Sequence, residues 1–78
     1  MATDKPTFNN IDEAYEWMYK TLEEQDERCI DNERFAFVDD EEAMLEYNEQ
    51  AEHGCCACFE SLIMVDGREA IIGCNYGH

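Results

Sequence analysis

Four residues in the last third of the chain have the types and spacing of a zinc site. Cys55, Cys58, Cys74 and His78 form the pattern C-x2-C-x15-C-x3-H, and thiolates with an imidazole are ligands that tetrahedral zinc takes. The hairpin register described below would bring Cys74 beside Cys58, but Cys55 would need a turn to join them. The alternative, which we favour, is that these cysteines are small buried apolar side chains with inert thiols.

Nucleophilic or redox chemistry at the same thiols has less support. Each histidine is close in sequence to a cysteine, His53 to Cys55 and His78 to Cys74, but no third group that would orient a catalytic pair is evident. A redox dithiol of Cys55 or Cys56 with Cys58 is disfavoured because no alternating strand and helix pattern surrounds it. We therefore predict a protein that is not an enzyme and has no cofactor, with zinc as the alternative.

Carboxylates are the more prominent group. The chain of 78 residues has 20 Asp and Glu against five Lys and Arg, a formal charge of −15. Residues 1–52 hold 17 acidic and four basic residues, a net −13, whereas residues 53–78 carry only −2. Many of the acids recur three or four positions apart, which on a helix places their Cβ atoms roughly 5–6 Å from one another. We predict that the partner is contacted by Asp12, Glu13, Glu16, Glu23, Glu24, Glu27, Asp39, Asp40, Glu41, Glu42, Glu46 and Glu49.

Such a surface excludes some partners and favours others. Coulomb repulsion opposes direct binding to nucleic acid or to an anionic membrane. An acidic face that only keeps the protein in solution is the ordinary explanation of a charge run, but here the usual interspersed bases are missing. We predict a basic nucleic-acid-binding protein or ribonucleoprotein as the partner, met by carboxylates at a density comparable to the roughly one charge per 1.7 Å of DNA axis. A homodimer is a further possibility.

The elements that position these groups begin with a β-hairpin over residues 57–76. Asp66-Gly67 stands between two runs rich in branched and aromatic residues, which is a strong signal for a two-residue turn. That turn places Val65 opposite Arg68 and Phe59 opposite Cys74. The face predicted to meet the core carries Phe59, Ile63, Val65, Ala70, Ile72, Cys74 and Tyr76.

Two amphipathic helices are predicted before the hairpin, over residues 11–29 and 40–53. Asn9 or Asn10 would cap the first helix, and Asp39 or Asp40 the second. Residues 1–10 are expected to be a polar leader, 29–32 a connector, and 34–38 a possible edge strand. The apolar stripes are formed by Ile11, Tyr15, Met18 and Leu22 and by Met44, Tyr47 and Ala51.

The predicted fold class is therefore α+β, a single domain over residues 1–78. Both acidic helices are expected on one side of a small antiparallel sheet built on the C-terminal hairpin. The N-terminus lacks the basic start and apolar run of a secretory signal, and an odd number of cysteines suggests reduced thiols. These features predict a cytoplasmic location, the host cytoplasm if the gene belongs to a phage.

In size, acidity and simple α+β architecture, the chain resembles small phage-encoded inhibitors of host proteins. This class includes anti-CRISPR proteins, anti-restriction proteins and inhibitors of uracil-DNA glycosylase, several of which mimic DNA. The resemblance covers overall character and no motif, so it transfers no site residue. It implies a stoichiometric inhibitor with an anti-defence role, and the alternative from another class is a small zinc-stabilised structural or adaptor module.

Overall fold

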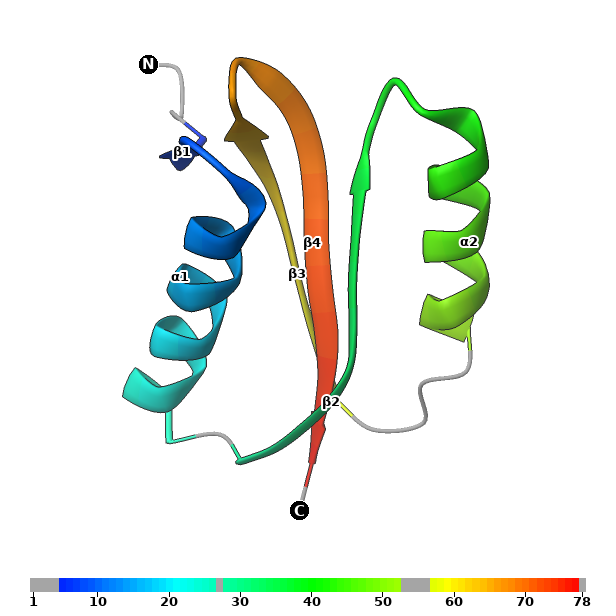
Figure 1. Cartoon of the computed structure of the whole chain (residues 1–78). Helices are drawn as coiled ribbons and strands as arrows, with labels where there is room; N and C mark the ends of the chain where they lie inside the picture. Colours follow the sequence, from blue (N-terminus) through cyan, green and yellow to red (C-terminus); the bar gives the residue numbers. More distant parts are fainter. Residues whose placement is uncertain (1–4, 27, 53–56, 78) are drawn as a thin grey trace.

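The structure, a computed structural model, describes residues 5–26, 28–52 and 57–77 and has the predicted α+β class. A four-stranded sheet, in the order β1-β3-β4-β2, stands between two helices (Figure 1). The strands are β1 (Thr7–Phe8), β2 (Arg28–Phe37), β3 (Ala57–Val65) and β4 (Arg68–Gly77), and the helices are α1 (Ile11–Glu24) and α2 (Glu41–Glu52).

The hairpin of β3 and β4 has the predicted register. Val65 lies opposite Arg68, and the pairing continues without a shift to Ala57 opposite Tyr76. Asp66 and Gly67 have φ values of 51° and 78°, the positive values that a primed two-residue turn requires. The face predicted to be inward is buried, with exposures of at most 1% at Ile63, Val65, Ala70, Ile72 and Cys74.

Helix α1 covers this first face of the sheet. Ala14, Met18 and Leu22 recur at helical spacing and are fully buried against the inward hairpin residues. Asn10 is the N-cap, and its Oδ1 accepts the backbone N–H of Glu13 at 3.0 Å. The capping side chain thereby satisfies one of the free N–H groups of the first turn.

Aromatic rings close the margin of this core. Trp17 is half-buried between Phe8 and Phe59, with ring centroids 5.5 Å and 5.8 Å away. Phe8 belongs to β1, which runs parallel to β3 and pairs with Met64 and Val65. The expectation of a polar leader over residues 1–10 is therefore wrong at Thr7 and Phe8, and the sheet is mixed instead of antiparallel.

The boundaries between α1 and β2 also differ from the prediction. Helix α1 ends at Glu24, short of residue 29, and Asp26 has a φ of 63°, which a continuing helix excludes. The connector predicted at residues 29–32 lies within β2, which pairs antiparallel with β4 and takes in most of the expected edge strand at 34–38. Two register shifts interrupt this pairing, and Asn32 has a φ of 54°. These irregularities explain why the segment has the sequence character of a turn.

Helix α2 packs on the opposite face of the sheet from α1, so the expectation that both helices lie on one side is wrong (Figure 1). We call the face that α2 covers the second face of the sheet. Along β2, Arg34 and Ala36 alternate with Phe35 and Phe37, and Arg34 and Ala36 are buried on this second face. Tyr47 of α2 lies against Gly73 of β4 on this face and is 2% exposed. Both faces of the sheet therefore carry residues that must be buried, and α1 covers one face while α2 covers the other.

Candidate protein-interaction surface

The outward face of α2 carries the densest group of predicted partner-binding residues. Tyr47 points to the sheet, which turns Glu42, Glu46 and Glu49 to the solvent at spacings of three and four residues. Leu45 lies among them with 66% of its surface exposed, and the four residues line one shallow depression. No Lys or Arg occurs in Glu41–Glu52. The face thus combines clustered negative charge with one exposed apolar side chain.

The turn that enters α2 extends this charge. Asp39, Asp40, Glu41 and Glu42 line a second depression together with Arg68. Asp39 accepts a hydrogen bond from Arg68 at 2.7 Å, which lowers the pKa of the Asp39 carboxyl. Asp40 caps the helix, because its Oδ1 accepts the N–H of Ala43 at 3.2 Å. Asp39 is therefore in an ion pair with Arg68, whereas Asp40, Glu41 and Glu42 are in none among the described residues.

We define the α2 acidic surface as Asp40, Glu41, Glu42, Glu46 and Glu49. All five are exposed, and within the described ranges none has a Lys or Arg nitrogen within 4.0 Å. Apart from the Coulombic attraction between Arg68 and Asp40, the described residues leave this charge unbalanced. An external cation, from salt or from a partner, is what can balance it.

The predicted residues of α1 form a separate surface. Asp12, Glu16, Glu23 and Glu24 are exposed. Glu13 is half-buried, and its Oε1 accepts the N–H of Asn9 at 2.9 Å, so it serves the helix start. Glu27 lies outside the described residues. Because α1 and α2 are on opposite faces of the sheet, the two acidic surfaces point away from each other and cannot form one array (Figure 1).

The structure separates the two described members of the predicted zinc set. Cys58 lies opposite Asn75, whereas Cys74 lies opposite Phe59, so the two side chains are on opposite faces of the hairpin. Cys58 is exposed, and Cys74 is fully buried in the core under α1, where burial raises the pKa of its thiol to about 11. The expectation that the register brings these thiols together is wrong. Cys55 and His78 lie outside the described residues, and the remainder holds no group of three His, Cys, Asp or Glu suited to a metal ion.

A buried polar group on the second face was not predicted from the sequence. Arg34 is 3% exposed, and its guanidinium donates to Asn32 O at 3.1 Å and to Asn75 Oδ1 at 3.0 Å. It stands 5.3 Å from the ring centroid of Tyr47, whose hydroxyl donates to Glu60 Oε2 at 3.1 Å. Burial, then the Glu60 carboxylate, raises the pKa of Tyr47 well above its ordinary value. This group holds α2 against the sheet below the acidic surface. The sequence signal that could have predicted the burial of Arg34 is its alternation with Phe35 along the strand.

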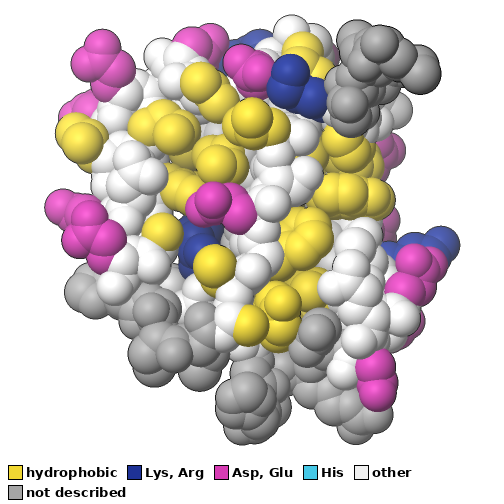
Figure 2. Space-filling model, turned by 180° about the vertical axis from the view of Figure 1, so that it is seen from behind, with side chains coloured by type: hydrophobic (Ala, Val, Ile, Leu, Met, Phe, Trp, Pro, Cys, Tyr) yellow, Lys and Arg dark blue, Asp and Glu magenta, His cyan; other side chains and the backbone are white. Residues whose placement is uncertain are grey.

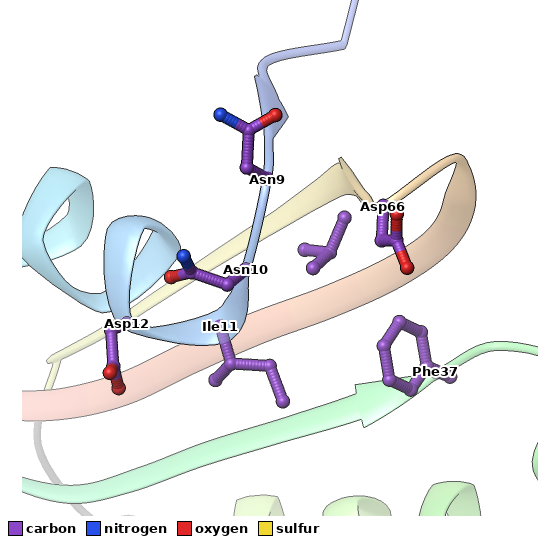
Figure 3. Close-up of a pocket in the computed structure, with 7 residues that line it drawn as sticks. Asn9, Asn10, Ile11, Asp12, Phe37 and Asp66 are labelled. Atoms are coloured by element: carbon purple, nitrogen blue, oxygen red, sulfur yellow. The ribbon is translucent and has the colours of Figure 1, made fainter.

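A further depression lies where α1 begins. Its lining residues are Asn9, Asn10, Ile11, Asp12, Phe37, Val65 and Asp66. Figure 3 shows Ile11, Phe37 and Asp66 converging on it, while the Asn9 side chain points away. The lining contains no thiol, imidazole or amine, so its contacts are apolar or involve carboxylates and amides.

Comparison with known proteins does not assign this surface. No family model, curated protein or solved structure matches the chain. Within the described ranges, neither helix has the length and apolar character needed to cross a membrane.

Proposed function

We propose that the protein is a non-enzymatic inhibitor that binds a basic nucleic-acid-binding protein or ribonucleoprotein of the host. The contact is the α2 acidic surface, which mimics the phosphates of DNA. The observation that supports this proposal is the set of five exposed carboxylates without an ion-pair partner in the described part of the chain. An anti-defence role, of the anti-CRISPR or anti-restriction kind, is the biological form of this proposal.

The physical reason lies in the partner. Its Lys and Arg side chains are already arranged to meet closely spaced phosphates, so a rigid helix whose acidic residues have Cβ atoms roughly 5–6 Å apart meets them with little rearrangement. Association should be fast and should weaken with salt, because exposed charges are screened beyond about 8 Å at physiological ionic strength. The α2 acidic surface is preferred over the α1 surface because Lys20 interrupts the latter.

Two charge-reversal variants test this choice. Glu42→Lys with Glu46→Lys changes the α2 acidic surface, and Glu16→Lys with Glu23→Lys changes α1 by the same charge. Each pair shifts the formal charge from −15 to −11, since every Glu→Lys change adds two. Immobilised wild type should capture a nucleic-acid-binding protein from bacterial lysate, identified by mass spectrometry. The α2 pair should lose it by orders of magnitude, whereas the α1 pair should retain it.

Competition with the cognate nucleic acid completes the test. Mimicry requires that DNA or RNA displaces the wild-type protein from the captured partner, because both occupy one site. Circular dichroism of both variants checks that the fold is intact. Simultaneous binding of protein and nucleic acid, together with equal affinities of all three proteins, would show that the acidity is only a solvated surface.

A further inference from the structure

The second face of the sheet is only partly covered. A helix is about 10 Å wide and strands lie about 4.8 Å apart, so one helix covers roughly two strands. Helix α2 packs on β2 and reaches β4 through Tyr47 and Gly73. Strand β3 lies beyond β4. Glu60 at the near end of β3 still reaches Tyr47 of α2 through a hydrogen bond. Leu62, further along the same face, is 48% exposed beside the half-buried Met64.

These side chains belong to a continuous apolar area. Ile71 pairs with Leu62 across the hairpin and with Ala36 of β2, which is buried. Figure 2 shows hydrophobic side chains gathered over this side of the molecule, with Asp and Glu side chains at the margin and one acidic side chain among them. We call this apolar area the open apolar surface and define it by Met44, Leu45, Leu62, Met64 and Ile71.

We propose that the open apolar surface docks an amphipathic helix of the partner, with an apolar stripe flanked by Lys and Arg. Strand β3 lies beyond β4 on the side away from β2. A helix satisfies its own backbone groups, so its apolar stripe can lie on the exposed side chains of the sheet. This inference rests on the proposed function and names the part of the partner that binds.

Charge argues for this occupant over a second copy of the chain. Glu60 is next to Leu62 on the same face of β3, and the flank of α2 beside Leu45 carries Glu41. Lysine and arginine beside an apolar stripe would meet these carboxylates. A second copy would instead bring another net charge of −15 to the same place.

A defined probe tests the docking site without knowledge of the natural partner. The probe is an 18-residue Lys/Leu peptide whose leucines form one helical stripe, and its control has the same composition in an order without a stripe. At 0.15 M salt, the wild-type protein should bind the striped peptide at least about tenfold more tightly than its control, as expected for the burial of one or two leucines. Leu62→Ser should abolish that preference. Ile11→Ser, which changes a 38% exposed residue at the start of α1, should keep it.

Amide chemical shifts provide a measurement independent of the variants. In the wild-type protein, the striped peptide should shift the signals of Leu45, Leu62 and Met64. Equal affinity for both peptides, or shifts confined to other residues, would overturn the docking site and leave attraction by the α2 acidic surface intact. Dimeric wild type that becomes monomeric with Leu62→Ser would assign the surface to a second copy and overturn the proposal. Loss of partner capture by the Glu42→Lys and Glu46→Lys variant concerns only the proposed function.

Discussion

Replacing Gly73 with alanine should destabilise the protein, because Tyr47 occupies the space that a Cβ would need. A Cβ built at Gly73 lies 2.5 Å from Tyr47 Oη and 2.6 Å from the carbonyl oxygen of Phe59. Both distances are shorter than side-chain carbon atoms tolerate. Tyr47 is 2% exposed and its hydroxyl donates to Glu60, so it cannot move aside without a loss of packing or of this hydrogen bond.

The expected loss is about 2 kcal/mol of unfolding free energy. Overpacking of a filled core costs about 1–3 kcal/mol, and a lost hydrogen bond adds about 1 kcal/mol. Alanine offsets about 0.4–1 kcal/mol by restricting the unfolded chain. In a domain of this size, each kcal/mol corresponds to a melting temperature change of about 4–8 °C. Gly73→Ala should therefore lower the melting temperature by about 8–16 °C.

A double-mutant cycle identifies the source of the loss. Tyr47→Phe removes the nearer of the two clashing atoms, so Gly73→Ala should cost about 1 kcal/mol less in that background. Gly67→Ala is the control, since a Cβ there meets nothing within 4 Å but the residue has a φ of 78°. Its cost should be the same in both backgrounds. An unchanged melting temperature of Gly73→Ala, or an equal cost with and without the Tyr47 hydroxyl, would refute the packing of α2 described here.

Three further predictions follow from burial and charge. Ile63→Asp should unfold the protein because it buries an unpaired charge at a position that is 0% exposed. Leu62→Asp, at a position 48% exposed on the other face, should still fold. Circular dichroism melts in which Leu62→Asp is the less stable variant would contradict the face assignment. In the folded protein the pKa of Cys74 is raised from 9.0 to about 11, so the unfolded chain loses this proton first and the unfolding free energy should fall as pH rises from 9 to 11. Urea titrations should show a shallower fall over this range for Cys74→Ala, and an equal fall would assign the effect to other groups. Raising NaCl from 0.01 M to 1 M shortens the screening length from about 30 Å to about 3 Å and should raise the melting temperature, because self-repulsion at a charge of −15 is relieved; no change in calorimetry would mean that repulsion is negligible.

Predictions that depended on local chemistry agreed with the structure. The Asp66-Gly67 turn set the hairpin register, because a two-residue turn leaves only one pairing for the residues beside it. The buried stripe of Ala14, Met18 and Leu22 follows from helical spacing alone. Both predicted caps were narrowed to one residue, Asn10 and Asp40, by their hydrogen bonds to the first turn.

Predictions that depended on distant partners were less successful. The start of β2 was assigned to a connector, because its strand character comes from pairing with β4 some 40 residues later and its bulges resemble turn sequence. Thr7 and Phe8 were assigned to a leader, since two residues have no detectable period and become a strand only against β3. Cys58 and Cys74 were placed together because the register was applied to neighbouring residues without their alternation between faces.

The acidic character of the protein and the amphipathic pattern of each helix are properties of the sequence. Net charge is a sum over the residues and periodicity is a local spacing, so neither depends on contacts between distant segments. The side of the sheet that each helix covers was decided only by the tertiary structure, because both faces of the sheet carry residues that must be buried and one helix cannot cover them both. That arrangement divides the carboxylates into two surfaces that point apart and leaves Leu62 uncovered, so packing decides which carboxylates share one surface.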